Sequence, residues 1–195
     1  MEPIKFGLIG CGAFGRFCLE AYSSIEGLKI VAVADVRKAA AEALADEFGV
    51  DACYDAASII ARDDIRLLHL ATPPSSHYEN VLACAAAGKN CLCEKPLAMN
   101  TAQADEMLAA VKAKNLIAPV NFVLRYNDVT TAVKAILDSG VLGKVLSARL
   151  TNCASDSQLF PDHWFWDKKI SGGIFIEHGV HFFDLYRYWL GPGKV

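Results

Sequence analysis

The sequence predicts an α/β protein built on a doubly wound parallel sheet, and three observations support this. Strand-like and helix-like segments alternate from Ile4 to about Asn121, a pattern typical of a parallel sheet with helices on both faces. A glycine-rich turn directly follows the first strand. Beyond Asn121 a single strand pattern remains, and one strand cannot form a sheet alone. We therefore expect a Rossmann-type domain over residues 1–121 and an incomplete α+β domain over residues 122–195.

The glycine-rich turn lies between a predicted strand at residues 4–9 and an amphipathic helix, and its glycines have the spacing Gly-x-Gly-x-x-Gly. Gly10 permits a tight turn, Gly12 lets the backbone approach a pyrophosphate, and Gly15 lets the helix pack closely on the strand. The N–H groups of the first helical turn would face the same anion. The turn thus predicts dinucleotide binding by Gly10, Gly12, Ala13, Phe14 and Gly15.

An acidic residue ends the second predicted strand, which covers residues 30–35. Asp35 lies 20 residues after Gly15, where a carboxylate would reach the ribose hydroxyls of a bound dinucleotide. Such a carboxylate would repel the 2′-phosphate of NADP, and Arg37 could partly offset that repulsion. We therefore expect NAD as the cofactor, with NADP as the alternative. The competing interpretation is that Asp35 only caps the next helix.

The remaining elements of the first domain alternate without repeats or low-complexity linkers. The helix at residues 38–48 can end at Gly49, and Ser76 with Glu79 forms the capping-box pattern for a later helix. His69 lies within an apolar strand, so we expect a hydrogen-bonded core residue there. The elements expected after residue 48 are a strand near 52–54, a helix near 56–62, a strand at 66–71, a helix at 76–88, a strand at 89–93, a helix at 101–114 and a strand at 116–122.

The second region has a different pattern: a helix over 128–137, a strand over 144–152, a polar and aromatic loop over 153–169, and an apolar helix over 174–190. On that last helix, Glu177 and His181 are four residues apart and would share one face, where a carboxylate can orient a basic imidazole. The pair could instead be structural, as we expect for Asp184. A metal site of Glu177, His178 and His181 lacks the His-Glu-x-x-His order, and no metal is expected.

Lys95 follows the strand at residues 89–93, at the carboxyl end where open α/β sheets bind ligands. Judged alone, a lysine in such a place is more often a solvated turn residue. Glu94 and Pro96 make this turn stiff, and the peptide bond before Pro96 can be cis. The position therefore suggests a ligand contact without establishing one.

The composition excludes several classes of protein. Of the 195 residues, 53% are hydrophobic, yet no apolar run reaches the ~18 residues of a membrane span. The net charge of -3 and the lack of basic clusters argue against nucleic acid as a partner. The seven cysteines are scattered without metal-ligand spacing, and the first strand begins almost at once. We therefore expect reduced thiols, no leader segment and a cytoplasmic location.

Three segments together resemble the Gfo/Idh/MocA oxidoreductases, a family that includes glucose–fructose oxidoreductase and inositol 2-dehydrogenase. Residues 93–98, Cys-Glu-Lys-Pro-Leu-Ala, resemble the family's Glu-Lys-Pro signature. Residues 71–77, Ala-Thr-Pro-Pro-Ser-Ser-His, are similar to its cofactor loop, and residues 172–184 are similar to its catalytic helix. The resemblance extends over nearly the whole chain, from Ile4 to Gly191.

The resemblance implies an enzyme that transfers a hydride between a secondary alcohol of a sugar, polyol or related substrate and NAD or NADP. Lys95 would stabilise the substrate oxygen, and His181 would be the general acid–base. Glu177 stands where the family usually has Asp, which keeps the charge and shifts the carboxylate by one methylene. The other implied contacts are Thr72, Pro73, His77 and Glu94 for the cofactor and Arg125 and Trp166 for the substrate.

Members of this family are nearly twice as long as this chain. Their second domain contains a large antiparallel sheet that often forms the subunit interface, and most of it is absent here. The resemblance therefore implies that residues 122–195 are the N-terminal part of a substrate domain and that the full-length form is a homo-oligomer. The short length leaves a second hypothesis, a non-catalytic dinucleotide-binding or regulatory protein of the same fold, or an inactive fragment.

Overall fold

The computed structural model describes residues 2–153 and 159–193. The chain divides into two compact units, Met1–Asn121 and Phe122–Val195. The first unit contains a six-stranded parallel sheet in the order β3-β2-β1-β4-β5-β6. Its strands are β1 (Ile4–Ile9), β2 (Leu28–Ala34), β3 (Asp51–Cys53), β4 (Leu67–Leu70), β5 (Asn90–Glu94) and β6 (Val120–Asn121).

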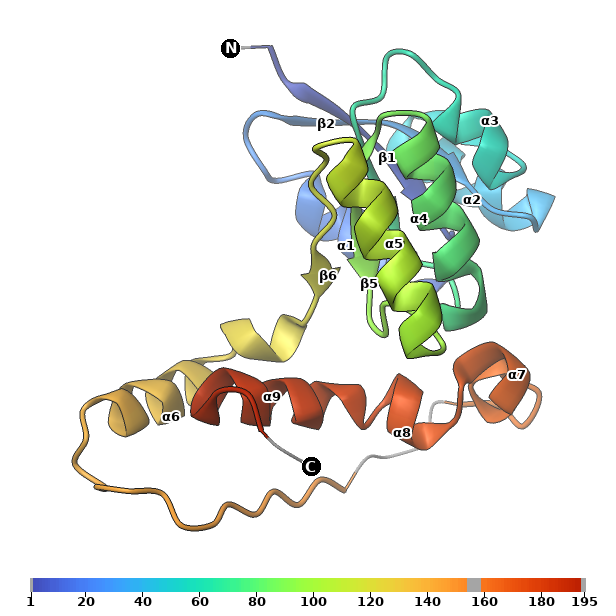
Figure 1. Ribbon diagram of the computed structural model, residues 1–195. Helices are drawn as coiled ribbons and strands as arrows, with labels where there is room; N and C mark the ends of the chain where they lie inside the picture. Colours follow the sequence, from blue (N-terminus) through green and yellow to red (C-terminus); the bar gives the residue numbers. More distant parts are fainter. Residues whose placement is uncertain (1, 154–158, 194–195) are drawn as a thin grey trace. The chain divides into compact units, whose positions relative to one another are not determined.

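Helices cover both faces of this sheet and enclose two hydrophobic cores. One core packs under α1 (Ala13–Tyr22) and α2 (Lys38–Phe48) and includes Phe6, Leu8 and Leu19. The other packs under α3 (Ala56–Ile60), α4 (His77–Ala86) and α5 (Thr101–Ala113), of which α4 and α5 lie side by side (Figure 1). The strands are therefore apolar on both sides, as parallel strands buried under helices are.

The predicted α/β class and most predicted elements of this unit are confirmed, with small differences at their ends. The last strand is the shortest, because only Val120 and Asn121 pair fully with β5. Before them, the carbonyls of Ile117 and Pro119 still accept hydrogen bonds from the N–H groups of Cys91 and Cys93. Pro119 has no N–H of its own to extend the ladder.

The predicted capping box at the start of α4 is wrong. A short 3₁₀ helix, η1 (Pro74–Ser76), precedes α4, and the hydroxyl of Ser76 donates to Thr72 Oγ1 at 2.8 Å and to the carbonyl of Pro73 at 2.9 Å. The Ser76 side chain therefore turns back into the loop instead of capping α4. The helix ends that are capped by side chains include those at Asp55 and Asn100, whose oxygens accept from backbone N–H groups three residues later.

The second unit is helical and irregular within its described residues. Its elements are η2 (Val123–Tyr126), α6 (Asp128–Asp138), η3 (Trp164–Trp166), α7 (Lys168–Ser171), α8 (Ile174–Glu177) and α9 (Val180–Leu190). The strand predicted over residues 144–152 is not formed, and that segment is largely exposed. A strand needs a neighbour for its hydrogen bonds, and the described part of this unit contains no other strand.

The single apolar helix predicted over residues 174–190 is divided into α8 and α9. Between them the N–H of Gly179 bonds to the carbonyl of Ile174 at 2.8 Å, five residues back. The N–H of His181 bonds to the carbonyl of His178, three residues back. A Cβ at position 179 would lie 2.8 Å from the carbonyl oxygen of Phe175, so the close turn requires glycine. Glu177 and His181 consequently do not share one regular helical face.

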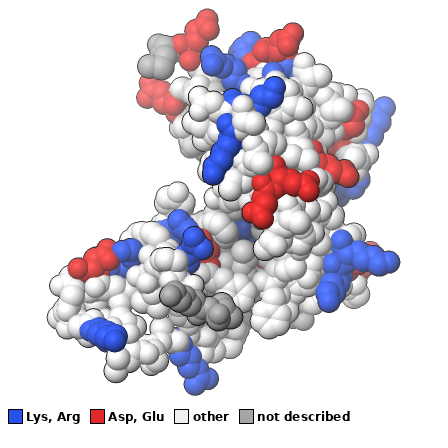
Figure 2. All heavy atoms as spheres, in the orientation of Figure 1, with Lys and Arg blue, Asp and Glu red and all other residues white. Residues whose placement is uncertain are grey.

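No helix in the described part of the chain is long and apolar enough to cross a membrane. On the face of the first unit that Figure 2 shows, Lys and Arg side chains lie among Asp and Glu side chains. All seven cysteines are free thiols.

Candidate functional site

The glycine-rich turn joins β1 to α1, and two of its glycines are required by close backbone contacts. Gly10 has a φ of +109°, and a Cβ there would lie 2.4 Å from the carbonyl oxygen of Ala71. A Cβ on Gly15 would lie 2.0 Å from the carbonyl oxygen of Gly10. Gly12 is different, because a Cβ at that position would meet nothing within 4 Å. The protein does not need glycine at position 12 for its own packing, which leaves that side of the turn open to a ligand.

The first turn of α1 faces the same opening. Gly12 is the N-cap residue and makes no side-chain cap, so no side chain caps this end of the helix. Ala13 and Phe14, which follow it, are exposed. Uncapped N–H groups and the positive end of the helix dipole favour an anion at this position. The ten-residue helix and the open turn together fit a pyrophosphate group.

Asp35 lies just beyond β2 and is tied to the glycine-rich turn. Its Oδ2 accepts from the backbone N–H of Cys11 at 2.9 Å, and its Oδ1 accepts from the backbone N–H of Arg37 at 2.8 Å. The Arg37 side chain reaches the same carboxylate, with nitrogen–oxygen distances of 3.1 Å to each oxygen. Asp35 does not cap the next helix, since the N-cap residue of α2 is Arg37. The competing interpretation of Asp35 as a helix cap is therefore wrong.

The pKa of Asp35 reflects opposing influences. Burial raises the pKa of this carboxyl, but the hydrogen bonds from Arg37 and Cys11 outweigh burial and hold the pKa below its ordinary value. Asp35 is therefore ionised at neutral pH. The guanidinium of Arg37 is exposed and can turn toward solvent or a ligand.

Both ring nitrogens of His77 face backbone carbonyl oxygens. Its Nδ1 lies 2.7 Å from the carbonyl oxygen of Pro96, and its Nε2 lies 2.8 Å from the carbonyl oxygen of Thr72. The ring is fully buried. His77 thus ties the loop after β4, which carries Thr72 and Pro73, to the turn after β5, which carries Lys95. Burial lowers the pKa of His77 even though both carbonyl oxygens favour the protonated ring.

Lys95 and Glu94 are placed differently although they are adjacent. Lys95 lies just past the end of β5, is partly exposed, and is followed by the cis peptide bond to Pro96. Glu94 is buried, and its Oε1 accepts from Nδ2 of Asn121 at 2.6 Å and lies 2.9 Å from Nε2 of His69. The carboxylate of Glu94 therefore has structural partners in His69 and Asn121, which the sequence motif does not reveal. The prediction that His69 is a hydrogen-bonded core residue is confirmed.

The carboxyl ends of four neighbouring strands therefore bring the predicted residues of the first unit to one edge of the sheet. The turn after β1 carries the glycines, Asp35 follows β2, Thr72 follows β4, and Lys95 follows β5. Open α/β sheets bind ligands at this edge, where the strand order reverses direction. In this sheet the reversal lies between β1 and β4, directly at the glycine-rich turn.

In the second unit, Arg125 and Asp184 form a double ion pair. Nε of Arg125 lies 2.7 Å from Oδ2 of Asp184, and the guanidinium also stacks near the rings of Phe122 and Tyr188. Asp184 is buried, so the pair holds η2 against α9. This geometry supports the structural interpretation of Asp184 and leaves Arg125 with a structural contact besides any contact with substrate.

The other predicted residues of the second unit lie on separate elements. Glu177 ends α8 and is buried, whereas His181 is in the first turn of α9. Nε2 of His178 lies 3.0 Å from Oδ1 of Asn152. The indole N–H of Trp166, in η3, donates to the carbonyl of Phe160 at 3.0 Å, and its ring is about half exposed.

The comparisons with known proteins cover nearly the whole chain. The model of the oxidoreductase family with an NAD-binding Rossmann fold matches residues 4–122, and the model of the GFO/IDH/MocA C-terminal domain matches residues 130–194. The chain is 33% identical to the inositol 2-dehydrogenase of Rhizobium meliloti over 193 residues, which are 98% of this chain and 56% of that one. It is 34% identical to the levoglucosan dehydrogenase of Pseudarthrobacter phenanthrenivorans, over 98% of this chain and 52% of that one.

A solved structure agrees with these sequence relatives. The myo-inositol 2-dehydrogenase of Lactobacillus plantarum superposes with a TM-score of 0.86 at 29% identity, covering 97% of this chain and 57% of that one. The chain thus spans about half the length of the curated relatives it matches.

Proposed function

Because the chain belongs to the Gfo/Idh/MocA oxidoreductase family and carries its NAD-binding Rossmann domain, we propose that it transfers a hydride between a secondary alcohol and a nicotinamide cofactor. The observation that carries the proposal is the carboxyl edge of the sheet. There an open glycine position, an uncapped helix N-terminus and an ionised Asp35 lie together, at the reversal of strand order. The fit is to a dinucleotide with two ribose groups and a pyrophosphate.

The residues of the first unit would hold the cofactor as follows. The backbone of Gly12, Ala13 and Phe14 would receive the pyrophosphate, and Asp35 would accept hydrogen bonds from the adenosine ribose. Thr72 and Pro73 would border the nicotinamide half, because their loop follows the neighbouring strand β4. Bound NAD supplies the hydride acceptor of an alcohol oxidation. Asp35 favours NAD over NADP, and Arg37 weakens that preference.

Two side chains would handle the proton and the charge of the alcohol. His181 would take the hydroxyl proton on its imidazole, which is the usual side chain for this task near neutral pH. The ammonium group of Lys95 would donate a hydrogen bond to the oxygen as negative charge develops there. Glu177 would orient or charge-balance His181 across the break between α8 and α9. Arg125 and Trp166 are proposed as contacts for further substrate hydroxyls.

The substrate class follows from the relatives. The two named above act on inositol and levoglucosan by their names, and both compounds are rings that carry several hydroxyl groups. We therefore propose a sugar, polyol or related compound as the substrate. Since the matched relatives are about twice as long, the complete activity and a homo-oligomeric assembly are proposals for a chain that includes the remaining part of the second domain.

A second candidate function is a non-catalytic dinucleotide-binding or regulatory protein, or an inactive fragment. The observation that favours it is the second unit, where segment 144–152 has no pairing strand and large apolar side chains such as Leu146, Phe160 and Phe175 are exposed. Cofactor binding by the first unit requires none of these residues. An enzyme would additionally need His181 and Glu177 held in a defined geometry.

The test separates binding from turnover. Fluorescence titration of residues 1–195 with NADH and NADPH measures cofactor binding, and a screen of sugars and polyols with NAD measures hydride transfer. We expect NADH to bind more tightly than NADPH, and a polyhydroxylated ring to be oxidised by the longer form. Binding without turnover on any substrate, in both forms, would favour the regulatory candidate. Absence of binding to either reduced cofactor would contradict both.

A further inference from the structure

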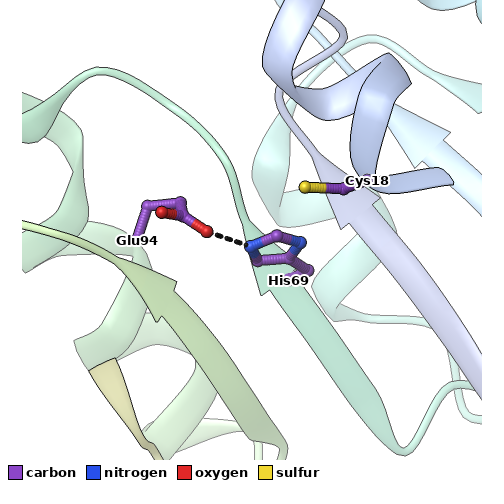
Figure 3. A group of neighbouring side chains, drawn as sticks. All are labelled: Cys18, His69 and Glu94. Atoms are coloured by element: carbon purple, nitrogen blue, oxygen red, sulfur yellow. Dashed lines mark hydrogen bonds and ion pairs between the residues drawn. The ribbon is translucent and has the colours of Figure 1, made fainter. Parts of the chain in front are cut away.

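A line of polar side chains crosses the interior of the first unit beneath the carboxyl edge of the sheet. The hydroxyl of Tyr22, on α1, lies 3.2 Å from Nδ1 of His69, on β4. Nε2 of His69 lies 2.9 Å from Oε1 of Glu94, at the end of β5. The amide of Asn121, on β6, donates to the same oxygen at 2.6 Å. Figure 3 shows His69 and Glu94 facing one another, with Cys18 of α1 beside the ring.

The chemistry of these groups determines the direction of each hydrogen bond. An ionised carboxylate only accepts, so the Nε2 atom of His69 carries the hydrogen that is donated to Glu94. With that hydrogen on Nε2, Nδ1 is the ring atom left to accept from the hydroxyl of Tyr22. The ring of Tyr22 is held in turn by an edge contact with Phe6, with ring centroids 5.1 Å apart. His69 is fully buried, and the hydroxyl of Tyr22 also interacts with the thiol of Cys18.

A metal ion is the other interpretation of this cluster. Three possible ligand atoms lie within 4.8 Å of one another, one from each of Cys18, His69 and Glu94. However, His69 and Glu94 already satisfy each other at hydrogen-bond distance, and a metal would displace that bond. The hydrogen-bonded line is therefore the better interpretation.

The line reaches one part of the proposed site. At one end is Tyr22, the last residue of α1, at the end of this helix away from the glycine-rich turn. At the other end, Glu94 is the last residue of β5 and immediately precedes Lys95. Successive side chains leave a strand on opposite sides. Holding the carboxylate of Glu94 toward α1 therefore constrains the direction in which Lys95 leaves the sheet.

We propose that His69 is a positioning residue that holds Lys95 in place through Glu94, with Tyr22 keeping the His69 ring in the donating tautomer. The inference rests on the proposed function only for what Lys95 does to the substrate. The placement of Lys95 is a property of the first unit and can be measured without any substrate.

The first measurement is the reactivity of Lys95 in the full chain. Brief labelling with acetic anhydride, followed by mass spectrometry, gives the labelling of Lys95 relative to the exposed lysines Lys112 and Lys114 of the same molecule. We expect His69→Leu to raise this ratio by about tenfold, the factor that one charge-assisted hydrogen bond is worth. His69→Gln places an amide N–H near the former Nε2 and is expected to restore most of the native ratio.

Two further variants keep the test decisive. Tyr22→Phe removes only a hydroxyl, so it keeps the fold if His69→Leu does not, and it is expected to raise the ratio by a smaller factor. Cys84→Ala makes a cavity in the opposite core and is expected to leave the ratio unchanged. An unchanged ratio in both His69→Leu and Tyr22→Phe would overturn the proposal. An equal rise in Cys84→Ala, or no recovery in His69→Gln, would overturn it as well, because a general loosening would then explain the result.

The metal interpretation and the proposed function have separate readouts. Binding of one equivalent of Zn²⁺ to the wild-type chain that is lost in Cys18→Ser and His69→Leu would identify a metal site and overturn the proposal. In the form that turns over, His69→Leu is expected to lower kcat by about tenfold with little change in the KM for NAD. If Lys95 labelling responds as expected but kcat does not, the positioning holds and the proposed role of Lys95 fails.

Discussion

Substituting alanine at two glycines of the same turn distinguishes a glycine required by the fold from one required by the ligand. A Cβ on Gly15 would lie 2.0 Å from the carbonyl oxygen of Gly10, and both are backbone positions that cannot move independently of β1 and α1. A Cβ on Gly12 would meet nothing within 4 Å. Gly12 has a φ of -80° and a ψ of -176°, which alanine adopts without strain.

The two variants are expected to differ in stability. Alanine within a helix gains about 1 kcal/mol over glycine, and overpacking costs about 1–3 kcal/mol or more. Because the overlap at Gly15 is with backbone atoms, the cost of overpacking is expected at about 3 kcal/mol. After the helix-propensity gain, Gly15→Ala is expected to lower the free energy of unfolding by about 2 kcal/mol. For a unit of this size that corresponds to a Tm lower by roughly 8 °C. Gly12→Ala is expected to lose less, about 0.5–1 kcal/mol, because alanine is a poorer N-cap residue than glycine.

The affinity for the cofactor is expected to fall more in Gly12→Ala than in Gly15→Ala. The added methyl of Gly12→Ala occupies the space through which a pyrophosphate would approach the backbone, so its Kd for NADH is expected to rise by at least about tenfold. Thermal unfolding by circular dichroism and fluorescence titration with NADH provide the two measurements. A native Tm in Gly15→Ala would refute the packing argument, and native NADH affinity in Gly12→Ala would refute the proposed place of the pyrophosphate.

The remaining predictions concern the cofactor, catalysis, pH and association. Asp35→Asn is expected to narrow the preference for NADH over NADPH, measured by titration with both, and an unchanged ratio would exclude Asp35 as the selecting group. In a form with a complete second domain, Lys95→Met and His181→Ala are each expected to cut turnover by ~10²-fold or more, while His181→Ala leaves the Kd for NADH nearly unchanged; near-normal turnover in His181→Ala would disprove its role as proton acceptor. Because burial lowers the pKa of His77 below its ordinary 6.5, the unfolded chain binds the proton more readily, and the free energy of unfolding is expected to fall as pH drops below about 6.5. Urea unfolding at several pH values measures this free energy in the wild type and in His77→Asn, which is expected to lose this part of the pH dependence. If the free energy of unfolding falls equally with pH in both proteins, the pH dependence comes from another group. The exposed apolar side chains of the second unit predict self-association of residues 1–195, which light scattering measures, and a monodisperse monomer with robust activity would contradict that expectation.

For the first unit the sequence alone predicted the fold class and most of the elements, because these signals are local. The alternation of apolar strands with helices predicts the parallel sheet, because each segment carries its own periodicity. The spacing of Gly10, Gly12 and Gly15 predicts the turn, although the carbonyl of the distant Ala71 also requires glycine at position 10. Asp35 was predicted at the end of the second strand, and its carboxylate accepts from the N–H of Cys11 in the turn.

The tertiary structure decided those features that depend on a partner distant in sequence. Segment 144–152 alternates like a strand but forms none, because no other strand in the described part of the second unit offers hydrogen bonds to it. The backbone contact at Gly179 interrupts the apolar helix that periodicity alone predicts as continuous. The two ring nitrogens of His77 each lie near a backbone carbonyl oxygen, and one of these carbonyls is 19 residues away in the chain. The line from Tyr22 through His69 to Glu94 is likewise hidden from the sequence, since it joins residues 47 and 25 positions apart that only the tertiary fold brings together.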